Sequence, residues 1–383
     1  MSIKNLIREK IVQSPNQRIT FAEYMEIVLY HPQYGYYGSG KVKIGARGDF
    51  FTSSSLGADF GELLAEQFVE MWEIIGHPAP FTLVEMGAGT GILAQDILAY
   101  VQQKYPDFFK NIEYIIIEQS EGLRKQQQNL LQEWEKKVSF FSNLKEMAAE
   151  SIIGCCFSNE LIDAFPVHRI KIMGGKIEEI YVSYVEEQLV EVSGKPSTNQ
   201  LIEYFNLVEI ELSSKAYPDG YCTEVNLAAL TWLETVARCL KRGYVLTIDY
   251  GYSAQNYYHP QRYQGTLQCY YHHRCHNNPY VNIGEQDITT HADFTALEYQ
   301  GKLWGLEPVG KTKQGMFLMA LGLGARLTAL ASGKFTFMEV IERRDALHQL
   351  INPTGLGKFA VLLQSKRLRE HEKKMLKGFN LSE

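Results

Sequence analysis

The stretch Leu-Val-Glu-Met-Gly-Ala-Gly-Thr-Gly at residues 83–91 decides the fold of this chain. It follows a short apolar run and leads into residues 92–98, where apolar side chains recur at helical spacing. A strand, a glycine turn and a helix in this order are typical of an α/β protein with a parallel sheet. The sequence therefore predicts a ligand-binding crevice at the carboxyl end of this strand.

The glycines of the turn indicate the kind of ligand. They stand at the alternating positions Gly87, Gly89 and Gly91, whereas the dinucleotide fingerprint has its third glycine one place later, at Ile92. Glycine lets the backbone approach a ligand closely, and the next helix offers free N–H groups to a carboxylate. Glu85 adds negative charge. S-adenosylmethionine, with its carboxylate, ammonium and sulfonium, suits this site better than a pyrophosphate; an ordinary tight turn is the alternative.

A second acidic residue favours the same ligand. Residues 112–117 form an apolar run that predicts the next buried strand, and Glu118 follows directly. A carboxylate at the tip of the second strand, about 20 to 30 residues after the glycine turn, is where a ribose diol is held by hydrogen bonds. We expect Glu118 to bind the ribose, with a solvated acid at a strand end as the alternative.

The composition of the 383 residues is that of a globular protein, with 45% hydrophobic and 21% charged residues. The net charge of −6 argues against a general nucleic-acid binder, because binding phosphates needs a basic face. No run of 18 apolar residues predicts a membrane span, and residues 1–13 lack the apolar core of a signal peptide. We therefore expect a cytoplasmic protein of bacterial type whose acidic sites favour cationic substrates.

The six cysteines include no CxxC pair, which favours reduced thiols over disulfides. Five potential ligands nevertheless cluster between residues 269 and 276. Their spacing matches no zinc pattern, so we predict no metal and keep a metal site as the alternative. The cluster consists of Cys269, His272, His273, Cys275 and His276.

Strands alternating with helices predict a doubly wound, mostly parallel sheet. Further strands are expected at 138–141, 154–158 and 243–251, and an aromatic loop over 252–287. From about residue 167 to residue 211 the period changes, and the apolar residues on both sides of Gly174-Gly175 predict a hairpin within an inserted antiparallel β element. The expected parts are a helical N-terminal region (1–76) packing on the cofactor domain, a Rossmann-like core (77–166 and 212–365), the inserted element (167–211) and a charged C-terminal helix (366–383).

Several motifs narrow the class further. Besides the glycine turn, they are PQYGYY at 32–37, GDF at 48–50, SNELIDAFPV at 158–167, DYGY at 249–252, GTL at 265–267 and GEQDIT at 284–289. Together these motifs resemble the MidA family of S-adenosylmethionine-dependent methyltransferases, a group that includes the mitochondrial arginine methyltransferase of complex I assembly, over most of residues 19–325. Ser54 and Ser55 depart from the family, which has Pro-Glu there, and Ala88 and Thr90 are smaller than in the mitochondrial member.

The resemblance implies a class I methyltransferase fold and ω-N dimethylation of protein arginine. It also implies a protein substrate that presents arginine, a subunit of a respiratory NAD(P)H dehydrogenase, while a homo-oligomer is left open. The chemistry is consistent with this activity, because a guanidinium stays protonated at neutral pH and presents a rigid fork of donors. Carboxylates must orient it and receive a proton as the methyl bond forms.

The candidate catalytic residues follow the fourth and fifth strands. Asn159 and Glu160 come directly after the fourth strand, and Asp163 shares a face with Glu160 if the segment is a helical turn. Asp249 ends the fifth strand, and Asp287 in the aromatic loop could extend the acidic funnel. The alternatives are capping by Asn159 and Asp163, and loop hydrogen bonding by the other two.

His291 is a general-base candidate by residue type, with a structural hydrogen-bonding role as the stronger alternative. For the cofactor, Asn143-Leu144 after the third strand is placed to contact the adenine edge, and Asn159 is also a candidate contact. Phe51-Thr52-Ser53 is expected to close over the methionine end. The alternatives for these segments are loop capping and core packing.

Two other functions stay open at this point. One is methylation of a small planar molecule that stacks on the aromatic loop. The other is a non-catalytic assembly or binding protein that keeps the cofactor fold and docks through residues 167–211. An oxidoreductase is the weakest choice, because the glycine spacing is wrong for a pyrophosphate.

Overall fold

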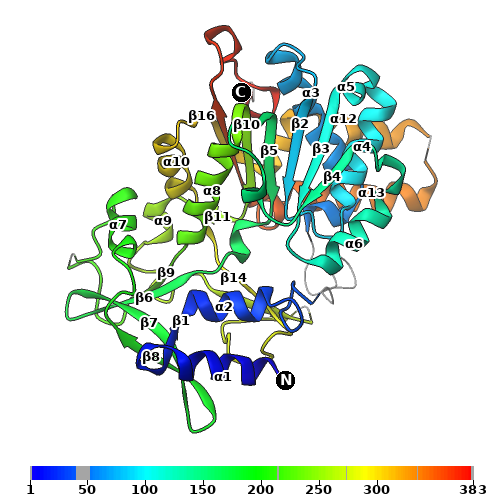
Figure 1. The fold of residues 1–383 in the computed structure, drawn as a ribbon. Coiled ribbons are helices and arrows are strands. Elements are labelled where there is room, and N and C mark those ends of the chain that lie inside the picture. The colour runs from blue at the N-terminus through cyan, green and yellow to red at the C-terminus, as the bar shows by residue number, and fades with distance from the viewer. Residues whose placement is uncertain (1, 40–51, 214, 273, 334, 381–383) are drawn as a thin grey trace.

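The computed structural model describes residues 2–39, 52–213, 215–272, 274–333 and 335–380. In this part of the chain the largest sheet has seven strands in the order β16-β17-β10-β5-β2-β3-β4 (Figure 1). The five strands from β10 to β4 run parallel, and β16 and β17 add an antiparallel edge. The strands are β2 (Phe81–Met86), β3 (Ile112–Ile117), β4 (Val138–Phe141), β5 (Ile152–Asn159), β10 (Leu240–Asp249), β16 (Glu307–Lys313) and β17 (Ala360–Lys366).

The strand order places a switch point between β2 and β5. The chain runs from β2 to β3 and β4 on one side, then returns to β5 on the other side of β2. Ligands of open α/β sheets bind where the order reverses, beyond the carboxyl ends of the strands. This confirms the predicted doubly wound, mostly parallel sheet, and it brings the segment after Met86 next to the segment after Asn159.

Helices cover both faces of this sheet, because successive strand residues point to opposite sides. Leu83 packs in a core with Phe68 and Ile97, whereas its neighbour Val84 packs with Leu233 on the other face. The first core is covered by α3 (Asp59–Ile74), α4 (Ile92–Lys104), α5 (Pro106–Asn111), α11 (Gln314–Ala320), α12 (Leu323–Ala329) and α13 (Phe337–Ile351), and the second by α8 (Leu227–Cys239) and α10 (Phe294–Leu303).

The inserted antiparallel element is confirmed, but it is larger than residues 167–211. Its sheet takes β1 from the N-terminal region and β9 from beyond the expected boundary, because both pair by backbone hydrogen bonds with its hairpin. The sheet consists of β1 (Arg18–Thr20), β6 (His168–Met173), β7 (Lys176–Val185), β8 (Gln188–Gly194) and β9 (Cys222–Val225), with α7 (Gln200–Leu207) beside it.

The N-terminal helices α1 (Ile3–Gln13) and α2 (Phe21–Tyr30) lie with this antiparallel sheet (Figure 1). Ile7 and Phe21 share a core with Val182 of β7 and with Ile288 of strand β14 (Asp287–Thr289). Within region 1–76, therefore, α3 covers the parallel sheet, whereas α1 and α2 pack against the antiparallel sheet. The capping box that opens α2 at Thr20 is present as the sequence predicts.

The expected aromatic loop contains short elements of its own. Backbone pairing of the tyrosine-rich segment with later residues forms a small sheet, β13-β12-β14. Within the described residues no group of three or more His, Cys, Asp or Glu could hold a metal ion, and His273 lies outside them. The elements are β11 (Gly251–Tyr252), α9 (Ala254–Tyr257), β12 (Gln268–Tyr271), β13 (Arg274–His276), β14 (Asp287–Thr289) and β15 (Ala292–Asp293).

The expected charged helix over 366–383 does not form in the described part of this segment. Two 3-10 turns, Glu370–Glu372 and Lys377–Phe379, follow β17 instead. Glu372 pairs with Arg242, and the ring of Phe379 lies 5.2 Å from that of Phe317. These tertiary contacts hold the segment residue by residue and override its helix propensity.

Membrane-spanning potential is weak in the described residues. No single helix there is long and apolar enough to cross a membrane. The segments Gln314–Ala320 and Leu323–Ser332 pass the test of length and composition only as a pair, bent by 68°. Phe317 and Leu318 of the first segment are buried in the core of the protein.

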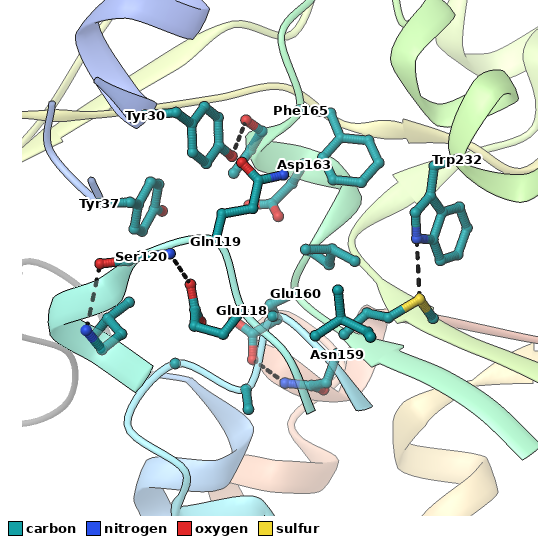
Figure 2. A pocket seen from close by; sticks show the side chains of 18 of the residues that line it. Tyr30, Tyr37, Glu118, Gln119, Ser120, Asn159, Glu160, Asp163, Phe165 and Trp232 are labelled. Atoms are coloured by element: carbon teal, nitrogen blue, oxygen red, sulfur yellow. Dashed lines mark hydrogen bonds between the residues drawn. The ribbon is translucent and has the colours of Figure 1, made fainter. Parts of the chain in front are cut away.

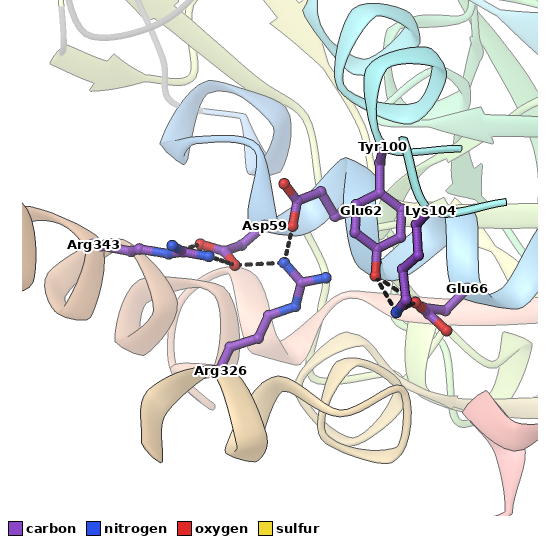
Figure 3. A network of polar contacts seen from close by, with 7 residues as sticks. All are labelled: Asp59, Glu62, Glu66, Tyr100, Lys104, Arg326 and Arg343. Carbon is purple, nitrogen blue, oxygen red and sulfur yellow. Dashed lines mark hydrogen bonds and ion pairs between the residues drawn. The ribbon is translucent and has the colours of Figure 1, made fainter. Parts of the chain in front are cut away.

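Ion pairs fasten α12 and α13 to α3. Asp59 accepts hydrogen bonds from Arg343 at 2.7 Å and from Arg326 at 2.7 Å, and Arg326 also pairs with Glu62 (Figure 3). A second group joins α3 to α4, with Glu66 accepting from Lys104 at 2.6 Å. Burial alone would raise the pKa of Asp59, but the hydrogen bonds from the two arginines lower it.

Replacing Asp59 with alanine is expected to lower the free energy of unfolding by about 2 kcal/mol, because two partly buried guanidinium groups lose their shared partner. Urea denaturation measures this change. Glu121→Ala removes an exposed ion pair with Lys125 and is the control, which should leave stability nearly unchanged. Equal effects of the two substitutions would contradict a structural role for the Asp59 pairs.

Candidate functional site

A cavity of about 1390 Å³ opens at the carboxyl ends of β2, β3, β5 and β10 (Figure 2). Pockets for one small molecule usually measure about 300 to 1,000 Å³, so this one has room for a cofactor and a second group. The residues that follow β2, β3 and β5 all line it. The switch point of the sheet is therefore hollow, as the sequence predicts.

The glycine turn forms one wall of the cavity. Gly87, Gly89 and Gly91 have φ angles of 73, 55 and 86°, in the left-handed region that favours glycine. A Cβ atom on Gly87 would lie 2.7 Å from Cδ1 of Leu161. Helix α4 begins directly after the turn, and no side chain of the described residues caps its start. A ligand can therefore approach the turn backbone and the first N–H groups of the helix.

Two buried acids flank the turn. Glu85 accepts a hydrogen bond from the hydroxyl of Tyr114 at 2.6 Å, and burial raises its pKa to about 7. Glu118 accepts from the backbone N–H of Ser120 at 2.9 Å and from Nε2 of Gln127 at 3.2 Å. Burial raises the pKa of Glu118 as well. Both acids line the cavity.

The segment after β4 also lines the cavity. Asn143 is exposed and accepts from the backbone N–H of Lys145 at 2.9 Å, whereas Leu144 is buried. The carboxylate of Glu146 in turn accepts from the backbone N–H of Asn143 at 2.9 Å. The capping alternative for Asn143 is thus present, and its side chain still lies at the cavity.

The Thr52-Ser53 segment meets the segment after β5. The backbone N–H of Ser53 donates to Oε1 of Glu160 at 2.9 Å, and its hydroxyl donates to Gln314 at 3.1 Å. Thr52 lines the cavity, whereas Ser53 is fully buried behind it. Phe51 lies outside the described residues.

Glu160 occupies a strained position at the carboxyl end of β5. Its φ is 54°, unusual for a residue with a side chain, and its backbone N–H donates to the carbonyl of Ile248 at 2.9 Å. Nδ2 of Asn159 donates to Oε1 of Glu160 at 3.1 Å. Burial raises the pKa of Glu160 to about 7. The condition under which Glu160 and Asp163 would share a helical face is not met, because the left-handed Glu160 lies outside the 3-10 turn at Ile162–Ala164.

Asp163 and Asp249 differ in their surroundings. Asp163 lines the cavity and accepts from the Tyr250 hydroxyl at 2.7 Å, and burial raises its pKa to about 6. Its Oδ1 atom is buried and has no hydrogen-bond partner among the described residues. Asp249 is fully buried and accepts from the backbone N–H groups of Ile162, Asp163 and Tyr250 at 2.8, 3.3 and 2.8 Å. Asp249 therefore holds the turn that presents Asp163.

Tyrosines from the N-terminal region complete the acidic end of the cavity (Figure 2). The hydroxyl of Tyr30 donates to the carbonyl of Ala164 at 2.7 Å, and that of Tyr37 donates to Asp287 at 2.8 Å. Asp287 also lines the cavity. Neither tyrosine is a predicted site residue, although Tyr37 belongs to the motif at 32–37.

Gln127 and Trp232 were also missed. Gln127 is fully buried on α6 (Glu121–Leu130) and donates to the carbonyl of Gly89 at 2.8 Å as well as to Glu118. Gln127 stands four residues after Leu123, so the sequence could have predicted that both side chains lie on the buried face of this polar helix. Trp232 of α8 lines the cavity, and its Nε1 lies 3.2 Å from the sulfur of Met86. Nothing in the sequence near Trp232 indicates that contact.

His291 lines the same cavity, but its surroundings disfavour the charged form. Burial, followed by the nearby cations Arg262 and Lys358, lowers its pKa to about 4. Its ring stacks on that of Tyr252 with centroids 4.9 Å apart. His291 is thus neutral at pH 7 and packed between aromatic rings.

These features define a class. A parallel sheet with a glycine turn after β2, an acid after β3 and a large cavity at the switch point is a class I-like S-adenosylmethionine-dependent methyltransferase. The chain belongs to the family described as "Putative S-adenosyl-L-methionine-dependent methyltransferase", whose model matches residues 63–312. Its cofactor is S-adenosylmethionine, and it is an enzyme of the methyltransferase class.

A solved structure agrees with this assignment. The crystal structure of a COG1565 superfamily member from Burkholderia thailandensis, bound to S-adenosyl-homocysteine, is 29% identical with a TM-score of 0.85, and the match covers 98% of this chain and 94% of that one. Proteins named protein arginine methyltransferase NDUFAF7 are also similar. The Drosophila melanogaster homologue is 27% identical over 93% of this chain and 83% of its own length. The Homo sapiens protein is 28% identical over 92% and 81%, and both are named mitochondrial. The predicted family is therefore confirmed.

Proposed function

We propose that this chain methylates the guanidinium group of arginine side chains in a protein, as ω-N dimethylation. The observation that carries the proposal is the buried Oδ1 of Asp163, which has no hydrogen-bond partner among the described residues. Leaving such an acceptor unpaired costs about 1 to 3 kcal/mol, and more for a charged group, so a donor is needed there. A guanidinium offers a charge and several N–H donors. The names of the similar proteins support the same substrate class.

The donor half of the cavity fits S-adenosylmethionine. Gly87, Gly89 and Gly91 let the methionine end approach the turn, and Glu85 faces its cationic groups. Glu118, held by Gln127, is placed to accept from the ribose hydroxyls. We assign the adenine edge to Asn143-Leu144, and closure over the methionine end to the segment Phe51-Thr52-Ser53, with Asn159 as a further contact.

The acceptor half binds and orients the guanidinium. When bound, the cofactor supplies a methyl group activated by a sulfonium. Asp163 and Glu160 hold the guanidinium beside it, and placement at near-attack distance supplies much of the rate. Glu160, whose pKa burial raises to about 7, receives the proton that the nitrogen loses. Asn159 positions Glu160 through its 3.1 Å hydrogen bond, and Asp249 positions Asp163 through the turn.

We further propose that the methylated protein is a subunit of a respiratory NAD(P)H dehydrogenase. The motif resemblance over most of residues 19–325 supports this choice. The names of the relatives support the reaction, and the choice of target rests on the motif resemblance.

The test is transfer of label from methyl-tritiated S-adenosylmethionine into an extract of cells that lack this protein. After acid hydrolysis, the label is expected to elute with methylated arginines, and Asp163→Asn should reduce it at least tenfold. Donor affinity of this variant, measured by calorimetry, should stay within about twofold of the wild type, because Asp163 lies in the acceptor half. Label in small molecules but not in protein would favour a different acceptor.

A further inference from the structure

A row of stacked side chains begins at Asp163 and runs along the cavity. The Tyr250 hydroxyl donates to Asp163, and the Tyr250 ring lies 5.0 Å from that of His291. His291 stacks on Tyr252 at 4.9 Å, and the guanidinium carbon of Arg262 lies 4.4 Å from the centre of the Tyr252 ring. All five side chains line the cavity. The stack therefore connects a negative end of the cavity to a positive one.

Backbone pairing keeps this stack in place. Gly251 and Tyr252 of β11 pair with Ala292 and Asp293 of β15, directly after His291. The backbone N–H of Ala292 also donates to the carbonyl of Tyr250 at 3.0 Å. The side chains of the stack thus come from two paired segments, and their spacing is set by the fold.

Two cations of the cavity lining lie on the two sides of His291: Arg262 ends the stack beside Tyr252, and Lys358 precedes Phe359, whose ring lies 5.4 Å from that of Tyr250. Both are close enough to His291 to help lower its pKa. Among the described residues, neither forms an ion pair with a carboxylate, and Arg262 uses one donor, Nε, on the carbonyl of Asn256 at 3.3 Å. The nearby buried Glu224 accepts instead from Thr266, at 2.8 Å from its backbone N–H. The two cations can therefore bind an anion from outside.

A second, shallower hollow continues from the Arg262 end of the stack. It measures about 450 Å³ and shares Tyr252 and Arg262 with the main cavity. Asn256, His259 and Gln261 form the rest of its lining. An extended polypeptide with its arginine beside Asp163 could leave the main cavity along this hollow.

We propose that Arg262 and Lys358 form a specificity site for an acidic side chain of the substrate, a short distance along the chain from the methylated arginine. The inference rests on the proposed function. The three steps of the stack measure 5.0, 4.9 and 4.4 Å, and an extended chain advances about 3.3 to 3.6 Å per residue. About four residues of extended chain span these three steps, and the reach of the arginine and glutamate side chains shortens the separation to as few as two, so the acid lies about two to four residues from the arginine. The preferred substrate segment therefore contains both the arginine and an acidic residue.

The test uses the full chain saturated with S-adenosyl-homocysteine and nonapeptides capped at both ends. Each peptide has a central arginine in a Gly/Ala background and one glutamate, moved from four residues before to four residues after it. Matched peptides carry glutamine, and affinity is measured by calorimetry. At a spacing of two to four residues on one side, glutamate is expected to bind about tenfold more tightly than glutamine. The capped ends ensure that only the side chain supplies the anion.

Two variants test whether the preference for glutamate over glutamine depends on Arg262 and Lys358. In Arg262→Gln/Lys358→Gln the preference should fall below about twofold, whereas Lys145→Gln, which removes a cation elsewhere in the lining, should keep it. Arginine-dependent binding with no preference for glutamate, or a preference that survives in the double variant, would overturn the specificity site. If no arginine peptide binds, or arginine can be replaced without loss, the proposed function itself fails.

Discussion

Replacing Glu160 with glutamine is expected to lower kcat/KM for methyl transfer about 10³-fold, while the dissociation constant of S-adenosylmethionine changes less than about twofold. Glutamine keeps the shape of the side chain and can still accept from Ser53 and Asn159, which donate to Oε1 at 2.9 and 3.1 Å. It cannot accept the proton of the guanidinium. Initial rates with labelled donor, together with calorimetry of donor binding, separate the two effects.

The pH dependence supports the same assignment. Because burial raises the pKa of Glu160 to about 7, the carboxylate form is lost as pH falls below neutrality. The kcat/KM of the wild type should therefore rise with pH up to about 7 and then level, and this rise should be smaller in the residual activity of Glu160→Gln, where Asp163 and Glu85 still titrate. Glu26→Gln, which changes an exposed glutamate in the same lining, is the control and should keep the wild-type profile.

The same substitution should stabilise the fold above neutral pH. A carboxyl whose pKa is raised in the folded state binds its proton more tightly there than in the unfolded state. Stability is therefore lost as pH rises from the unfolded pKa to about 7, by an amount on the order of 3 kcal/mol. Glu160→Gln removes that cost, so its urea midpoint at pH 8 should exceed that of the wild type. A destabilised, fully active variant would exclude Glu160 from the proposed role.

The second large effect is expected at Gly87, where valine should weaken donor binding about 100-fold. Its φ of 73° is unfavourable for a β-branched residue, and its Cβ atom would lie 2.7 Å from Cδ1 of Leu161. Either the turn or Leu161 must move, and both belong to the cavity lining. A combined cost of about 2.7 kcal/mol corresponds to this loss of affinity.

Gly175→Val is the matched control for that substitution. Gly175 has a φ of 70° in the hairpin between β6 and β7, and nothing lies within 4 Å of an added Cβ atom. The two variants therefore share the backbone cost but differ in position. Donor binding should be normal in Gly175→Val, as measured by calorimetry, and similar binding by both variants would remove the glycine turn from the donor site.

Sequence patterns could predict the parts of the site that follow the strands. The carboxyl ends of parallel strands meet at one edge of a sheet, so Glu85, Glu118 and Glu160 are brought together by strand order alone. The turn glycines are recognisable because their left-handed φ angles require that residue. The positions of these residues around one cavity were therefore open to prediction.

Contacts between distant segments could not be predicted in this way. Tyr30 reaches Ala164 from the N-terminal region, and Trp232 reaches Met86 from α8, without any local pattern that marks the pairing. Asp249 also ends a strand, yet its carboxylate is taken up by backbone N–H groups of the neighbouring turn. Strand-end position alone does not distinguish such a positioning residue from one that faces the cavity.

The most direct measurement compares two peptides on the chain saturated with S-adenosyl-homocysteine. One contains arginine and the other citrulline, which has nearly the same shape but no charge and fewer donors. Calorimetry should show the arginine peptide binding at least about tenfold more tightly, because Asp163 and Glu160 need a cation that donates. In Asp163→Asn the difference should shrink. Equal binding of both peptides by the wild type would contradict a guanidinium site in this cavity.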